Sequence, residues 1–155
     1  AWHFIPRGYK IHLVVDKEMA AQRVFSADRR DETYPNAGAA YAANAQRQQI
    51  ENERFQQYYG IDCNRWENYD LILDSGTLAP TELATRALEA HARCAKGPEC
   101  QLDPARLLPA PGARDAESYP PLVRPQNDEV EVLAGMNHVL AARSLASPLI
   151  ACRLA

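Results

Sequence analysis

The sequence predicts an α/β fold with a partial parallel sheet, followed by a smaller α+β module. Two buried-strand patterns alternate with helical patterns in the first part, and the composition changes near residue 94. The strand patterns are the β-branched, apolar runs 10–15 (KIHLVV) and 69–73 (YDLIL). A chain of 155 residues suits one ordinary domain or two small ones.

Three helices are predicted between and after these strands. Residues 16–30 begin at Asp16, a residue type that caps helix N-termini. Residues 39–59 contain no Gly or Pro, which predicts one long helix that ends at Gly60. Pro80 suits the first position of a third helix, which we expect to run to about Arg93.

The C-terminal part contains more proline than the first part of the chain, and its predicted helices and strands are shorter. Residues 101–118 are expected to be mostly irregular. Two short strands, a helix and a last strand are predicted after them: 121–124, 129–133, 137–145 and 149–153. We therefore predict a first domain at 1–92, a linker at 93–100 and a second module at 101–155.

Composition excludes several classes of protein. The net charge is −3, no apolar run has the length of a membrane span, and no basic recognition helix indicates DNA as a partner. The four cysteines have no zinc-site spacing, so no metal site is predicted. The chain is expected in the cytoplasm, although a disulfide between Cys94 and Cys100 would indicate an oxidising compartment.

Two arginines on the long predicted helix form the main candidate site. Arg47 and Arg54 are almost two helical turns apart, so both guanidinium groups project from the same face. Two forked cations on one face can hold a polyphosphate or a transferring phosphoryl group. The alternative is a structural role, because Arg47 and Glu51 also have the spacing of a helical ion pair.

The region 8–92 resembles the C-terminal portion of cytidylate-kinase-like P-loop kinases. The resemblance is carried by the arginine–acid–arginine pattern and by two further motifs, FQQYYGID at 55–62 and YDLILDSGTLAP at 69–80. It implies that Arg47 and Arg54 contact phosphates, with Arg23 and Arg30 on the side of a mobile lid. It also implies a structural role for Asp74. The chain has no glycine-rich phosphate-binding loop of its own.

The region 101–155 resembles a degenerate ParB/sulfiredoxin-like domain. The resemblance is carried by LDPARLL, YPPLVR and EVLAGMNHVLAAR in that order. In that family the turn before the helix binds phosphate or nucleotide, where helix N-terminal amides favour an anion. The resemblance makes Gly135, Asn137 and His138 a second phosphate-binding candidate.

These observations together predict a nucleotide- or phosphate-binding protein. We expect the C-terminal part of a kinase-like phosphotransferase that acts on a nucleotide or small hydroxyl acceptor, with Mg²⁺ and ATP. It would be an enzyme only if a phosphate-binding loop came from outside this chain, and no catalytic residue is assigned. The alternative is a non-enzymatic binding or assembly subunit without a cofactor. The expected partner is a nucleotide or phosphorylated small molecule. The front sheet is expected to be completed by another protein chain in an oligomer, by a missing N-terminal segment or by the C-terminal module.

Overall fold

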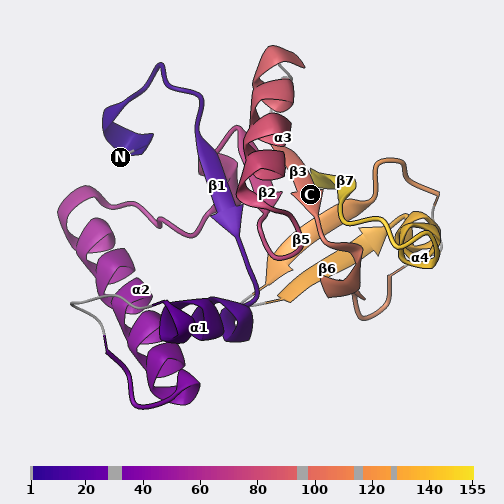
Figure 1. Ribbon diagram of the computed structural model, residues 1–155. Helices are drawn as coiled ribbons and strands as arrows, with labels where there is room; N and C mark the ends of the chain where they lie inside the picture. Colours follow the sequence, from indigo (N-terminus) through magenta and orange to yellow (C-terminus); the bar gives the residue numbers. More distant parts are fainter. Residues whose placement is uncertain (1, 28–32, 94–97, 114–116, 127–128) are drawn as a thin grey trace. The chain divides into compact units, whose positions relative to one another are not determined.

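The computed structural model describes residues 2–27, 33–93, 98–113, 117–126 and 129–155, and these form two compact units (Figure 1). The unit named here the sheet unit comprises Ala1–Val14 and Trp66–Ala155, and the helical unit is Val15–Arg65. In the order of the chain, the helical unit is therefore inserted between the first two strands of the sheet. The sequence predicted a boundary at 93–100, between the regions that resemble two different families, and this boundary stays a prediction. The two compact units divide the chain at other positions, after Val14 and after Arg65.

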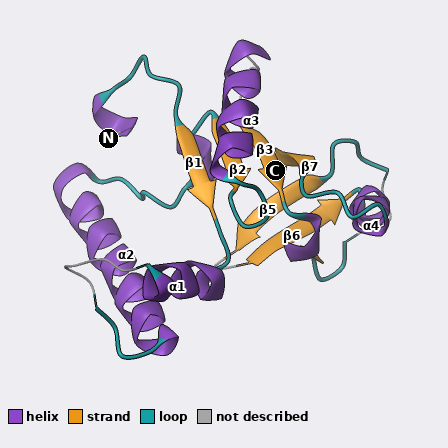
Figure 2. Cartoon of the chain, in the orientation of Figure 1, coloured by secondary structure: helices purple, strands orange, loops and turns teal. Residues whose placement is uncertain are grey.

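Figure 2 shows the helices and strands of both units. The elements of the sheet unit are η1 (Trp2–Phe4), β1 (Ile11–Val14), η2 (Trp66–Asn68), β2 (Leu71–Asp74), α3 (Pro80–Arg93), β3 (Glu99–Leu102), η3 (Pro104–Arg106), β4 (Leu107–Pro109), β5 (Leu122–Gln126), β6 (Glu129–Ala134), α4 (Met136–Ser144) and β7 (Ile150–Leu154), where η marks a 3-10 turn. The helical unit contains α1 (Lys17–Ser26) and α2 (Ala37–Tyr59). Among the described helices, none offers the unbroken apolar length that a bilayer crossing demands.

Seven strands form one mixed sheet in the order β1-β2-β3-β7-β5-β6-β4, which confirms the α/β class. β1, β2 and β3 run parallel, with Leu13 beside Leu73 and Leu73 beside Gln101. β7 is antiparallel to β3 and parallel to β5. The C-terminal strands therefore extend the sheet of the front region. Pairing of another chain or an N-terminal segment with the outer edge of β1 stays a prediction.

The two faces of the sheet bury separate groups of side chains. On one face, Leu71 and Leu73 of β2 pack with Ala90 of α3 and with Leu149. The opposite face carries the larger cluster, which consists of Trp66, Ile72, Cys100, Leu102, Leu107, Val123, Val130, Val132, Val139, Ile150 and Cys152. β2 is buried at all four positions because it lies between two neighbours and is covered on both faces.

Most predicted elements are present, with their ends shifted by at most four residues. The long helix is α2, and it ends as expected at Gly60, which has a left-handed φ of 67°. The expectation of mostly irregular chain at 101–118 is wrong in part, because β3 and β4 reach into this region. β3 is short and alternates polar with apolar residues, so its strand conformation depends on hydrogen bonds to β2 and β7.

The helical unit is a pair of helices that pack on each other. Asp16 caps α1 as predicted, since its side chain accepts a hydrogen bond from the backbone N–H of Met19 at 3.0 Å. α1 ends at Ser26, four residues before the predicted end, and the following residues 28–32 lie outside the described part. Among the described residues of this unit, only Ala21 and Ala40 are fully buried.

Candidate functional site

The arginines predicted to hold phosphate all belong to the helical unit. Arg47 and Arg54 are exposed on α2, and their spacing makes them project from the same side of that helix. Arg23 is exposed on α1, and Arg30 lies outside the described residues. Arg23 and Arg47 each take part in an interaction within the protein. Phosphate contact by these four arginines stays a prediction.

The second predicted anion site begins α4. Gly135 is the N-cap residue and has a φ of 82°. A Cβ atom at this position would overlap the carbonyl oxygen of Ser118, so the close approach of the two backbones requires glycine. Asn137 is exposed, and the ring of His138 meets that of Tyr119 edge-on with 5.0 Å between centroids. Backbone packing explains Gly135, while anion binding by Asn137 and His138 stays a prediction.

A buried ion pair lies at the carboxyl end of β2. The side chain of Asp74 is 1% exposed, and its Oδ2 accepts a hydrogen bond from Nη1 of Arg106 at 2.5 Å. Its Oδ1 accepts a hydrogen bond from the backbone N–H of Gly76 at 2.9 Å. Both carboxylate oxygens are therefore engaged, and the pair connects the loop after β2 to η3. This matches the structural role expected for Asp74.

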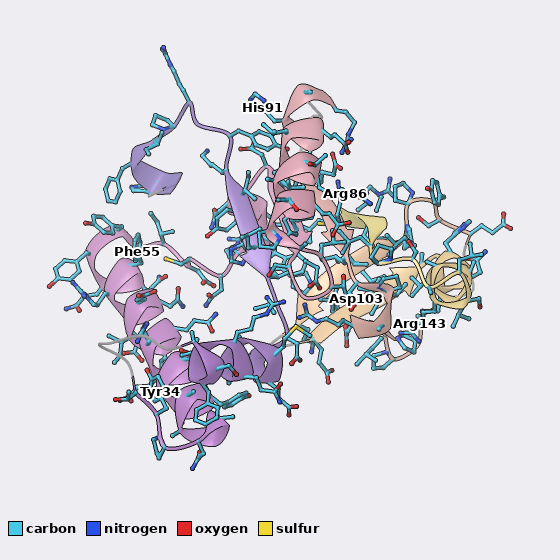
Figure 3. The ribbon with its side chains drawn as sticks, in the orientation of Figure 1. Tyr34, Phe55, Arg86, His91, Asp103 and Arg143 are labelled. Carbon is cyan, nitrogen blue, oxygen red and sulfur yellow. The ribbon has the colours of Figure 1, made fainter. Side chains whose placement is uncertain are left out.

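The η3 turn that carries Arg106 is held in place by α4. Nε of Arg143 donates to the carbonyl of Pro104 at 2.8 Å, and Nη2 donates to the carbonyl of Leu107 at 2.6 Å. Asp103 caps the turn with its side chain. Figure 3 labels Asp103 and Arg143, whose elements η3 and α4 are in contact. Arg143 thus positions Arg106 through the backbone of η3.

Asp74, Arg106 and Arg143 form a cluster that presents hydrogen-bond donors of Arg106 at the carboxyl ends of the parallel strands. This end of the sheet is where α/β proteins commonly bind ligands. The side chain of Arg106 is 23% exposed, so part of it reaches solvent. Asp74 is buried and paired, so it is not available as a general acid or base. Sequence reasoning missed Arg106 because its partner is 32 positions away and no local spacing indicates the pair. The detectable signal was an acidic residue directly after an apolar strand.

The cysteines do not form a metal site in the part of the chain that the structure describes, where no three His, Cys, Asp or Glu side chains cluster suitably. Burial raises the pKa of Cys100 to about 12, and burial raises the pKa of Cys152 to about 12. Cys63 belongs to the helical unit, and partial burial raises its pKa as well. Cys100 is a free thiol opposite Cys152. The alternative of a disulfide between Cys94 and Cys100 falls on a residue outside the described part.

A comparison with known proteins connects this chain to one enzyme class. An S-adenosylmethionine-dependent nucleotide dehydratase from Lacinutrix mariniflava is 35% identical to the chain over 88 residues. The match covers 57% of this chain but only 17% of the relative's length. No protein-family model matches the chain, and no solved structure matches it significantly.

This match corrects the function predicted from the sequence. The relative is named for S-adenosylmethionine and nucleotide dehydration, whereas the sequence predicted phosphate binding, kinase-like phosphoryl transfer with Mg²⁺ and ATP, or a non-enzymatic assembly subunit. As statements of what the protein does, those predictions are wrong on this finding. The match does not test the individual residues predicted to contact phosphate. Their basis was an arginine spacing on an exposed helix and two family resemblances carried by short motifs. Many unrelated helices share such a spacing, and resemblance of fold does not fix function.

Proposed function

We propose that this chain is part of an S-adenosylmethionine-dependent enzyme that removes water from a nucleotide. The observation that carries the proposal is the 35% identity over 88 residues with the dehydratase of Lacinutrix mariniflava. The chain corresponds to a small share of that protein, so we assign it one role within such an enzyme rather than the whole reaction. The partner it implies is the polypeptide that carries the remainder of the enzyme.

The described cysteines of this chain do not fit the cofactor side of such an enzyme. S-adenosylmethionine supplies radical chemistry in many enzymes, commonly beside an iron–sulfur cluster held by cysteine thiolates. Among the described cysteines, burial raises the pKa of Cys100 and of Cys152 to about 12, and partial burial also raises the pKa of Cys63. The cysteine set described here therefore lacks the exposed thiolates that a cluster requires. We derive no step through S-adenosylmethionine and place this chain on the substrate side of the enzyme.

The carboxyl edge of β2 is the best-defined surface for that role. The side chain of Arg106 is partly exposed there, and Asp74 and Arg143 hold it in one orientation. A nucleotide offers sugar and phosphate oxygens that accept hydrogen bonds from such a donor. The role of this chain would be to orient the nucleotide while the chemistry proceeds on another segment.

A segment exchange tests the proposal. This chain replaces the corresponding segment of the Lacinutrix mariniflava enzyme, and mass spectrometry follows a nucleotide product lighter by one water when S-adenosylmethionine is supplied. We expect a folded chimera to form this product. An Arg106→Gln chimera should show a raised KM for the nucleotide, while Arg124→Gln, which changes an exposed side chain on β5, should not. A folded chimera that leaves the nucleotide unchanged, beside an active parent enzyme, overturns the proposal.

A further inference from the structure

Two buried cysteines face each other where the parallel part of the sheet meets the C-terminal strands. Cys100 on β3 and Cys152 on β7 are direct partners in an antiparallel ladder, so their side chains lie on the same face. Cys100 is 0% exposed and Cys152 is 4% exposed. Both are free thiols, and the proximity of Cys152 contributes to raising the pKa of Cys100.

The backbone spacing of this pair suits a covalent link. Directly opposite residues in an antiparallel ladder have Cα atoms about 4.5 Å or about 5.5 Å apart, depending on the hydrogen-bond pattern. A disulfide accepts Cα separations of about 4.4–6.8 Å. The register of β3 and β7 therefore places Cys100 and Cys152 within the range of Cα separations that a disulfide accepts.

We infer that Cys100 and Cys152 form a redox-sensitive pair that closes to a cross-strand disulfide by exchange with a small-molecule disulfide such as oxidised glutathione. One protein thiolate attacks the small disulfide, forms a mixed disulfide and releases one small thiol. The second protein sulfur then attacks the mixed disulfide and releases the second small thiol. Two protein thiols are oxidised, one small disulfide is reduced, and both protons leave on the released thiols.

The surroundings of the pair set the rate of this reaction and its consequence. Buried thiols with pKa values of about 12 are almost entirely protonated at neutral pH, so exchange is slow and accelerates about tenfold per pH unit. The bond would link β3 to β7 and so join the parallel strands covalently to the C-terminal strands. Closing the long loop between them should raise the unfolding midpoint by roughly 10 °C.

The experiment uses the full chain with Cys63→Ser and Cys94→Ser, which leaves only the pair. The protein is incubated with oxidised glutathione at pH 7, 8 and 9, then analysed by intact mass and thermal unfolding. We expect a loss of two hydrogens at a rate that rises with pH, and a higher unfolding midpoint that returns to its starting value after reduction.

The matched control adds Cys152→Ser to the same background. It should show at most a bound glutathione on Cys100 and no rise in the unfolding midpoint. If the native protein does not react, it is unfolded in urea and refolded with oxidised glutathione. Unfolding exposes the two thiols, so burial no longer prevents their reaction. Thiols that stay unlinked after both treatments, or a linked protein that has lost its fold by circular dichroism, overturn the inference.

Discussion

The sheet unit and the helical unit differ in how much of their apolar surface they bury. Both apolar clusters of the described chain lie in the sheet unit. The helical unit fully buries only Ala21 and Ala40 among its described residues, and it leaves Phe25 47% exposed and Tyr58 69% exposed. Since apolar burial is the main stabilising contribution to folding, the sheet unit should determine the stability of the chain. The helical unit depends more on helix propensity and on its caps.

Hydrogen exchange should show the largest difference between the units. Amides of β2 and β3 should exchange only through global unfolding, because these strands are buried and hydrogen-bonded on both sides. Amides of α1 and α2 should exchange at least about 100-fold faster through local opening. Native-state exchange followed by mass spectrometry or NMR measures both sets. Equal protection in the two units would show that the helical unit is stabilised by contacts beyond its own.

Truncation of a leucine in the sheet should sharpen the same comparison. Leu73→Ala removes a side chain that is 0% exposed between β2 and α3, and it should lower the free energy of unfolding by about 2–5 kcal/mol. Ile50→Ala on α2 is the matched change, because Ile50 is 47% exposed, and it should cost less than about 1 kcal/mol. Urea titrations give both values. Similar losses at the two positions would contradict the division of stability described here.

Two glycines with left-handed φ values allow a comparison at the level of the backbone. Gly135→Ala would bring its Cβ into the backbone of Ser118 and should cost about 3 kcal/mol. Gly60→Ala meets no atom within 4 Å, so it should cost only the left-handed conformation, about 1 kcal/mol. Thermal and urea unfolding of both variants measure the difference. A Gly135→Ala protein as stable as Gly60→Ala would mean that the Ser118 segment moves freely.

Within the sheet unit, Arg143 and Arg124 allow a comparison between an arginine that positions the backbone and an arginine in a surface ion pair. Arg143→Lys loses the planar fork that binds the carbonyls of Pro104 and Leu107, and it should cost about 2 kcal/mol. Arg124→Lys changes an exposed pair with Glu131 and should cost less than about 0.5 kcal/mol. Equal stability of the two variants, measured in urea, would remove Arg143 from its positioning role.

His12 should make the smallest contribution to the free energy of unfolding. This contribution can be detected only as a dependence of stability on pH. His12 stacks on Tyr69 with 4.5 Å between ring centroids, and burial lowers its pKa below the ordinary value of 6.5. The unfolded chain therefore binds the proton more readily than the folded chain. The stabilising contribution of neutral His12 is present above pH 6.5 and is lost as the pH falls through the lowered pKa. Urea titrations from pH 7.5 to 5 should show this slope, and His12→Phe should reduce it.

Local sequence signals determined the helices and several strands of this protein. The absence of Gly and Pro before Gly60 predicted α2, Asp16 predicted the start of α1, and Pro80 predicted the start of α3. Each of these signals acts on residues within a turn or two of itself, so it can be recognised without knowledge of the rest of the fold.

The tertiary structure alone decided how these elements combine and where the candidate site lies. β3 is only four residues long, yet it joins the front region to the C-terminal strands in one sheet. Asp74 meets Arg106, and Cys100 meets Cys152, through contacts between positions far apart in the chain. Such pairs leave no periodic trace, because sheet register and the path of each loop determine which side chains become neighbours. The common face of Arg47 and Arg54 could be predicted from the sequence because one helix contains both residues, so local spacing alone determines it.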